Sequence, residues 1–178
     1  MSSGAVTKPT SPVYLFLNVF GKIMDEKIKG EDAVRRLYAR SDAPCYYTIV
    51  RPGGLTEERP GGVAALELNQ GDTISGRIAR ADVANICIES LAFEATRDAT
   101  FECYDADTAK PLSSVGVSNV LKQTTKPGGD DPAFRSGRER TGDTWAALFN
   151  GLQPDTPGLS HKARTFDNIA QGGDAAWV

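Results

Sequence analysis

The residues best suited to chemistry in this chain follow a β-branched run. The run Tyr47–Val50 leads through Arg51 into Pro52, Gly53 and Gly54. Such a pattern predicts a buried strand that ends at a loop, and loops at strand ends hold ligands in α/β folds. Glycine lets the main chain approach a flat ligand closely, but the same residues also suit a tight turn with positive φ that binds nothing. The residues alone leave both interpretations open.

A lysine on an apolar helical face is the second candidate. Apolar residues recur with the helical period from Val13 to Tyr38, and Lys27 and Glu31 interrupt this stripe. A lysine in such a place either binds a ligand or pairs with a carboxylate one turn away while its stem covers apolar surface. Because Glu31 lies one turn away, the ion pair is the favoured interpretation and a ligand contact is the alternative.

The elements that must position these residues follow from periodicity and from helix breakers. The sequence predicts helices over residues 13–40, 80–94 and 144–152, and strands over 46–51, 64–68, 73–78 and 100–104, with a loop over 52–62. Gly21 and Gly30 each weaken the first helix by about 1 kcal/mol relative to alanine, so the helix can kink near either. Asp82 is expected to cap the second helix, and Arg80 to pair with it or with a nearby carboxylate.

Composition narrows the class of protein. The chain has 178 residues, enough for one domain with a core, and a net charge of -3, which argues against bulk electrostatic binding of nucleic acid. No run of about 18 apolar residues is present, so no transmembrane segment is expected. Cys45, Cys87 and Cys103 are odd in number and widely spaced, which predicts reduced thiols packed as small hydrophobic residues. The one histidine, His161, has no neighbouring ligand cluster, so no metal site is expected.

Taken in order, these segments resemble the C-terminal half of an atypical short-chain dehydrogenase/reductase, of the NAD(P)-binding, NmrA-like type found in cyanobacteria and chloroplasts. The resemblance covers about residues 1–104 and rests on Ser2-Ser3-Gly4, Lys27 to Glu31, Tyr47 to Leu55, and Arg80-Ala81-Asp82-Val83-Ala84. It implies an α/β fold in which residues 1–104 form a partial Rossmann-like domain, the C-terminal half of a doubly wound parallel sheet. Residues 105–152 are then an irregular segment with a short helix, and residues 153–178 an extended polar tail.

The resemblance also implies a set of cofactor-facing residues, which are Ser3, Lys27, Pro52, Gly53 and Gly54. The lysine would hydrogen-bond the cofactor ribose and lower the pKa of a neighbouring phenol. Ile23 stands four residues before Lys27, where the proton-donating tyrosine of the standard mechanism would stand, so that mechanism is not expected. Ser2 and Ser3 match strand-end serines of which one would hydrogen-bond a substrate carbonyl, although a purely structural role is favoured for them.

The glycine-rich loop that binds pyrophosphate in this family has no counterpart, because G-x-G-x-x-G does not occur in the sequence. No cofactor is therefore expected for this chain alone, and NAD(P) is expected if an N-terminal half exists. The favoured hypothesis is a non-catalytic subunit or assembly factor docked on a larger, photosynthetic complex. The alternative is an NAD(P)-dependent oxidoreductase or NAD(P)-sensing domain whose N-terminal half is missing from the sequence.

The expected partners are protein subunits, because half of a doubly wound sheet leaves a sheet edge and apolar helix faces exposed. The polar tail is expected to be disordered when free. Nucleic acid is not an expected partner, since no platform of aromatic and basic residues is evident. The resemblance implies a place in the chloroplast stroma or at the thylakoid surface, peripheral to a membrane complex. Without the resemblance, the expected place is the cytoplasm.

Overall fold

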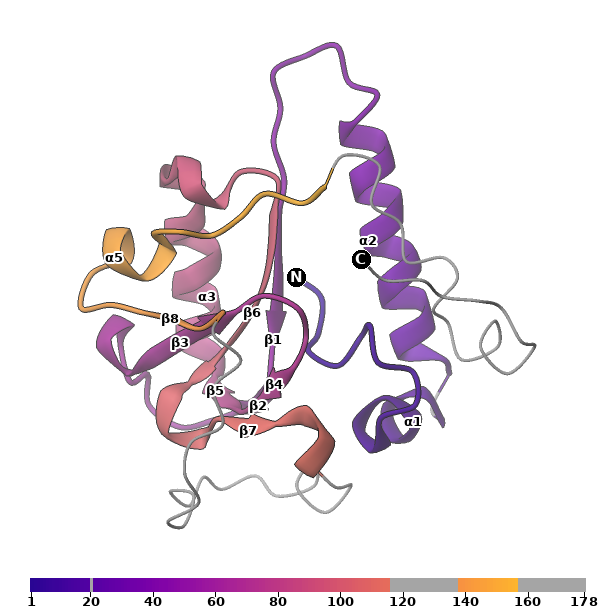
Figure 1. Ribbon diagram of the computed structural model, residues 1–178, viewed down its shortest axis with the longest axis vertical. Helices are drawn as coiled ribbons and strands as arrows, with labels where there is room; N and C mark the ends of the chain where they lie inside the picture. Colours follow the sequence, from indigo (N-terminus) through magenta and orange to yellow (C-terminus); the bar gives the residue numbers. More distant parts are fainter. Residues whose placement is uncertain (20, 116–137, 157–178) are drawn as a thin grey trace.

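A four-stranded sheet in the order β1-β6-β3-β8 forms the centre of the structure (Figure 1). The computed structural model describes residues 1–19, 21–115 and 138–156. In the sheet, β1 (Thr48–Pro52) and β6 (Ala99–Asp105) are parallel, while β3 (Leu66–Asn69) runs antiparallel to β6 and to β8 (Arg140–Thr141). Two small pairs flank it: β2 (Gly54–Thr56) with β5 (Arg77–Ala79), in parallel, and β4 (Ile74–Ser75) with β7 (Lys110–Pro111), antiparallel.

The N-terminal residues extend this sheet on the other edge of β1. The Ser2 N–H donates to the Val50 carbonyl at 2.7 Å, and the Gly4 N–H donates to the Pro52 carbonyl at 2.9 Å. Both chains advance by two residues in the same direction between these bonds, which is parallel pairing. Residues 2–4 therefore lie as a strand end beside β1, at the place where the serine motif was expected.

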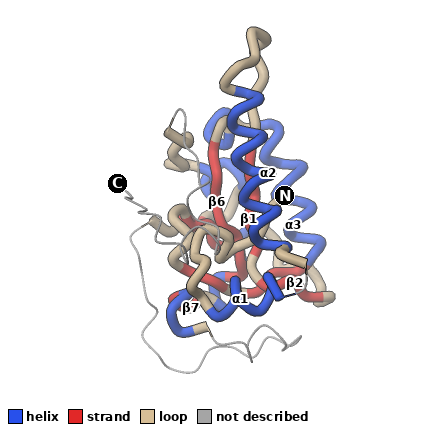
Figure 2. Tube along the Cα trace, turned by 90° about the vertical axis from the view of Figure 1, so that its right-hand side faces the viewer, coloured by secondary structure: helices blue, strands red, loops and turns tan. Residues whose placement is uncertain are grey.

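Helices cover both faces of the parallel strands. The helices α2 (Ile23–Tyr38) and α3 (Arg80–Glu89) lie on opposite sides of β1 and β6 (Figure 1), and α2 runs along both strands (Figure 2). The short α1 (Pro12–Val19) packs against α2, and α5 (Trp145–Phe149) lies against β3 and β8. The expected mixed α/β fold with parallel strands is thus confirmed. Within the described ranges, no helix is both long enough and apolar enough to span a membrane.

The two faces of the sheet differ in chemistry. Side chains alternate along β6, so Phe101 and Cys103 join the apolar core while Thr100 and Glu102 face α2. That core is built from the sheet, α3 and α5, namely Val50, Leu66, Leu68, Ile78, Val83, Ile86, Phe101, Cys103, Leu148, Phe149 and Leu152. A second cluster joins the N-terminal segment to α1 and α2 and contains Ala5, Val6, Val13, Tyr14, Met24, Ile28, Leu112 and Val115. The α2 face of the sheet is consequently polar at its centre.

The single helix predicted over residues 13–40 is two helices. Gly21 has φ of 83° and Lys22 has φ of 55°, so both lie in the left-handed region that ends one helix before the next begins. The kink expected near Gly21 is confirmed, and Gly30 lies inside α2 without a break.

Smaller differences from the prediction concern the bounds of single elements. The strand predicted over 73–78 is divided into β4 and β5 at Gly76, where a Cβ would lie 2.8 Å from Tyr104 Cβ. The helix predicted over 80–94 ends at Glu89 and continues as a 3-10 turn over Ser90–Ala92. The strands β2, β7 and β8 fall in segments expected to be loop or irregular, because pairing partners distant in sequence define them. His161 and the tail beyond residue 156 lie outside the described residues.

One of two side-chain predictions was wrong, and the other is confirmed. Asp82 does not cap α3, because its carboxylate accepts the N–H groups of Gly61 at 2.7 Å and Gly62 at 3.2 Å and so fastens the preceding loop. Arg80 pairs with a carboxylate other than Asp82, which was the second expected alternative: its Nε lies 2.5 Å from Glu57 on the surface.

The cysteines are free thiols, but they do not all pack as small hydrophobic residues. Cys103 is buried in the core, Cys87 packs against its edge, and Cys45 is exposed, so the expectation fails for Cys45. Burial raises the pKa of the Cys103 thiol well above its usual value, which makes that group inert.

Candidate functional site

The structure brings Lys27 together with the N-terminal strand end and the end of β1. The half-buried Lys27 Nζ donates a hydrogen bond to the Ser2 carbonyl oxygen at 3.2 Å. Ser3 is the next residue, and Gly4 is bound to the Pro52 carbonyl. Three of the five predicted cofactor-facing residues, Ser3, Lys27 and Pro52, therefore meet at one place.

Pro52 explains why the Ser2 carbonyl is free to accept this lysine. In a parallel ladder, the Ser2 oxygen would accept the N–H of residue 52, because the Ser2 N–H is bound to Val50. Proline has no N–H. The lysine ammonium therefore occupies a position in the ladder that a backbone donor would otherwise fill.

The prediction of an ion pair between Lys27 and Glu31 is wrong. The Glu31 carboxylate is taken by two arginines, Arg51 and Arg35, which reach it from the sheet side and from one turn further along α2. Lys27 carries three N–H donors, and Ser2 accepts one of them. The remaining donors leave the lysine able to bind a ligand hydroxyl.

Gly53 and Gly54 are used for packing of backbone against backbone. The Gly53 N–H donates to the Cys103 carbonyl at 3.0 Å, and the Gly54 N–H donates to the Gly76 carbonyl at 2.9 Å. A Cβ on Gly53 would lie 2.3 Å from the Gly76 oxygen. Neither Gly53 nor Gly54 has positive φ, so the tight-turn interpretation is wrong. The close approach that requires glycine at position 53 is to the chain itself.

Because of this packing, alanine substitutions at the two glycines should differ in their effect on stability. We expect Gly53→Ala to lower the free energy of unfolding by about 3 kcal/mol, because neither backbone can yield without loss of pairing between β2 and β5. Gly54→Ala is the matched control, since its nearest neighbour is the flexible Arg77 guanidinium at 3.3 Å. Urea denaturation of both variants measures the difference, and equal midpoints would contradict the argument.

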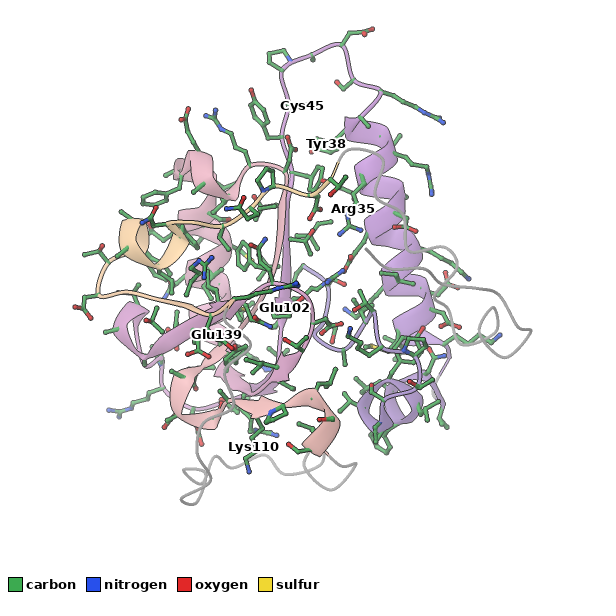
Figure 3. The ribbon with its side chains drawn as sticks, in the orientation of Figure 1. Arg35, Tyr38, Cys45, Glu102, Lys110 and Glu139 are labelled. Carbon is green, nitrogen blue, oxygen red and sulfur yellow. The ribbon has the colours of Figure 1, made fainter. Side chains whose placement is uncertain are left out.

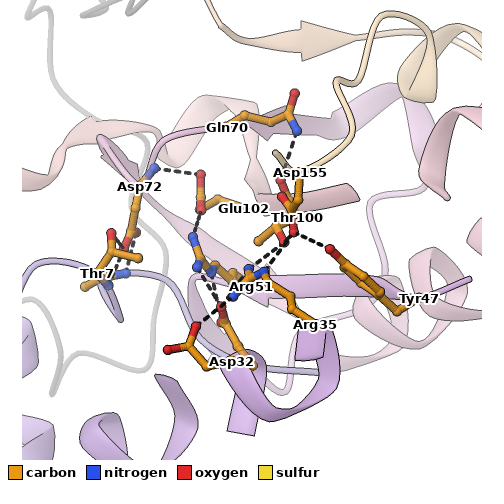
Figure 4. Close-up of polar contacts among 12 residues, drawn as sticks. Thr7, Asp32, Arg35, Tyr47, Arg51, Gln70, Asp72, Thr100, Glu102 and Asp155 are labelled. Carbon is orange, nitrogen blue, oxygen red and sulfur yellow. Dashed lines mark hydrogen bonds and ion pairs between the residues drawn. The ribbon is translucent and has the colours of Figure 1, made fainter. Parts of the chain in front are cut away.

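Beside the lysine lies a buried ionic network between α2 and the sheet (Figure 4). Arg51 Nε and Nη2 donate to the two carboxylate oxygens of Glu31 at 2.9 and 2.7 Å, and its Nη1 donates to Glu102 Oε1 at 3.1 Å. All three residues are buried. Burial alone would raise the pKa of Glu31, but the charge and hydrogen bonds of Arg51 outweigh it and hold that pKa below its usual value.

A second arginine continues the network toward the end of the described chain. Arg35 points from α2 toward the sheet (Figure 3), and its Nε donates to Asp155 Oδ2 at 2.9 Å. The hydroxyls of Thr100 and Tyr47 donate to the same oxygen at 2.6 and 3.0 Å. Burial and then the Asp155 charge raise the pKa of Tyr47 well above its usual value. Asp155 therefore anchors the segment that follows α5 to α2, β1 and β6.

The network ends at the N-terminal segment. Glu102 Oε2 accepts the Asp72 N–H at 2.9 Å, and the Asp72 carboxylate accepts the N–H of Ala5 at 2.6 Å and both the N–H and hydroxyl of Thr7, at 2.9 and 2.8 Å. Burial, followed by the Asp72 charge, raises the pKa of Glu102 to about 7 despite the neighbouring Arg51.

Sequence reasoning missed the network residues Arg35, Arg51, Asp72, Glu102 and Asp155. One signal was available, since Arg51 stands inside a β-branched run predicted to be buried, and a buried arginine needs carboxylates. Asp72 and Asp155 lie in short polar segments that resemble any other turn, so no local pattern marks them.

A comparison with protein families identifies the family to which this part of the chain is similar. A family model described as NAD(P)H-binding matches residues 1–94, which is more than half of the chain and includes Ser3, Lys27 and Pro52 to Gly54.

Three curated plant proteins are similar to part of the chain. A chloroplastic protein named for a high chlorophyll fluorescence phenotype, from Arabidopsis thaliana, is 41% identical over 85 residues. An uncharacterized chloroplastic protein of the same plant is 35% identical over 95 residues, and sanguinarine reductase from Eschscholzia californica is 38% identical over 91 residues. The matches cover 47%, 53% and 49% of this chain, but only 13%, 31% and 33% of these relatives. The matched family and the βαβ arrangement around Lys27 agree, and the chain belongs to the NAD(P)H-binding family.

Proposed function

We propose that this chain is part of a non-catalytic protein of the atypical short-chain dehydrogenase/reductase, NmrA-like type. Its function is to serve as a structural or assembly subunit docked on a larger, photosynthetic protein complex, at the stromal side or thylakoid surface of the chloroplast. The observation that carries the proposal is the absence of a proton donor at position 23, one turn before Lys27.

Ile23 is the first residue of α2 and is 45% exposed. Its side chain carries no proton to transfer, and Lys27 therefore has no phenol to activate in the arrangement that tyrosine–lysine chemistry needs. Tyr14 on α1 is no substitute, because it is fully buried and its hydroxyl donates to the Asp25 carboxylate.

The relatives support the setting. Two of the three similar plant proteins are chloroplastic, and one is named for a chlorophyll fluorescence phenotype. The proposal extends that compartment to this chain, and protein subunits of the complex are its proposed partners.

The site suits the ribose of an NAD(P) molecule, but it offers no close approach at Gly53. Lys27 offers donors to a ribose hydroxyl at the carboxyl end of the N-terminal strand, where dinucleotides bind in Rossmann-like sheets. The approach at Gly53 is filled by Gly76. NAD(P), when bound, supplies hydride transfer. We propose that it binds here only with a glycine-rich segment contributed from outside these 178 residues.

An NAD(P)-dependent oxidoreductase is the second candidate, and a specific observation favours it. Sanguinarine reductase is similar to this chain over 91 residues. In that case Lys27 would still orient the cofactor ribose, while the proton would come from a group other than residue 23.

The two candidates differ in what Lys27 does to turnover. For the full protein isolated from chloroplasts, we expect NADPH oxidation with quinone or aldehyde acceptors to stay at the background rate and to be the same in Lys27→Ala and Lys29→Ala. Lys29 is the matched control, being an exposed lysine of the same helix that pairs with Glu26 at 2.6 Å. Turnover that Lys27→Ala abolishes and Lys29→Ala keeps would establish the oxidoreductase instead.

Native gels of the same chloroplast extract test whether the protein is docked on a larger complex. A subunit should migrate in an assembly well above the mass of a single copy of the full protein. Migration as a free monomer under mild conditions would contradict the docked state.

A further inference from the structure

The buried Asp72 holds the N-terminal segment in place. This residue is fully buried with φ of 56°, and its carboxylate binds Ala5 and Thr7 through three hydrogen bonds. We call this set of three bonds the Asp72 clasp. Positive φ is tolerated by aspartate and asparagine better than by other side chains, so the turn presents the carboxylate at little conformational cost.

A chain of polar contacts joins the clasp to α2, the helix that carries Lys27. From Asp72 the contacts pass through Glu102 on β6 and Arg51 on β1 to Glu31 on α2 (Figure 4). Lys27 stands one turn before Glu31 and binds the Ser2 carbonyl, which returns to the N-terminal segment. The segment over residues 2–7 is thus fixed at one end by Lys27 and at the other by Asp72.

Charge along this chain of contacts is unevenly distributed around Glu102. Arg51 faces it from β1 and Asp72 from the 70–73 turn, while Glu31 of α2 already shares the Arg51 charge. Further along the same face, Arg35 is divided among Glu31, Asp32 and Asp155. One arginine therefore serves two buried carboxylates next to a third, so ionised Glu102 repels the group that holds the N-terminal segment.

We propose that Asp72 is a positioning residue for the Lys27 site, and that ionisation of Glu102 weakens the Asp72 clasp. The inference concerns the same site as the proposed function. Its test uses no cofactor and no turnover, so it can fail while the proposed function stands, and the reverse is equally possible.

The direction with pH follows from proton binding. With the clasp closed, burial and Asp72 hold the pKa of Glu102 at about 7. When the clasp opens, water reaches Glu102 and Asp72 moves away, so this pKa falls toward the ordinary value. The closed state then binds more protons than the open state. As the pH rises toward 7, opening therefore becomes more favourable, by up to about tenfold per pH unit. Above pH 7, both states are ionised and the effect levels off.

Amide hydrogen exchange of the full chain, followed by NMR, measures this opening directly. After correction for the intrinsic rate, the protection of the Ala5 and Thr7 amides should fall by ten- to a hundredfold between about pH 5 and 7, then stay level. Amides of the β1–β6 pairing are the internal reference for global unfolding. Protection that does not change with pH at residues 5 and 7 would overturn the inference.

Two variants separate the clasp from general stability. Glu102→Gln keeps the shape and one of the two accepting oxygens but cannot ionise, so the exchange profile of Ala5 and Thr7 should become flat. Asp72→Asn keeps an acceptor and tolerates the positive φ, but it removes the repelling charge, so the level region should begin at a lower pH. An unchanged profile in Glu102→Gln would contradict the assignment of Glu102, and an unchanged profile in Asp72→Asn that of Asp72.

Discussion

Arg51→Met is expected to lower the free energy of unfolding by about 3–5 kcal/mol, because it leaves Glu102 buried without its cation and Glu31 with Arg35 alone. Glu31 and Glu102 are 5% and 1% exposed, so water cannot replace the guanidinium. Arg51 also has three hydrogen bonds to these groups, at 2.7 to 3.1 Å. Chemical denaturation monitored by circular dichroism at pH 7 measures the loss.

A surface ion pair gives the matched control. Arg80 pairs with Glu57 at 2.5 Å, but the two side chains are 57% and 81% exposed. Arg80→Met is therefore expected to change the free energy of unfolding by less than about 1 kcal/mol. Adding Glu31→Gln and Glu102→Gln to Arg51→Met should recover part of the loss, since neutral amides cost less to bury than charges. A loss from Arg51→Met no larger than that from Arg80→Met would show that the network does not stabilise the fold.

The second large effect is on the pH dependence of stability. The pKa of Glu102 is about 7 in the folded protein, against 4.5 for an ordinary glutamate. Folding therefore binds a proton at this residue between these two values, and the free energy of unfolding falls as pH rises from about 4.5 to 7. For one residue, this difference amounts to about 3 kcal/mol.

Subtracting the Glu102→Gln profile from the wild-type profile isolates this contribution. The difference in free energy of unfolding should change by about 3 kcal/mol between pH 4.5 and 7 and be flat above pH 7. Glu94→Gln is the control, because Glu94 is a surface residue, 84% exposed, that pairs with Arg97. A difference profile for Glu102→Gln as flat as that for Glu94→Gln would show that Glu102 titrates normally.

Local sequence patterns predicted much of the fold correctly. The strand ending at Pro52, the helix around Lys27 and the helix beginning at Arg80 all form, because period and breakers act within a few residues. The details that were missed depend on residues far apart in sequence. Gly76 divides a predicted strand because Tyr104 approaches it, and Asp82 binds the loop at Gly61 in place of the nearer helix end.

The sequence by itself determined the NAD(P)H-binding family and the α/β class, because these follow from motifs on consecutive elements. Only the tertiary structure decided which charged side chains pair with one another. Glu31 binds Arg51 rather than Lys27, and Asp72 and Glu102 couple the N-terminal segment to the sheet. The physical reason is that a buried charge pairs with whichever opposite charge the packing of strands and helices brings within about 3 Å, and sequence spacing does not specify that partner.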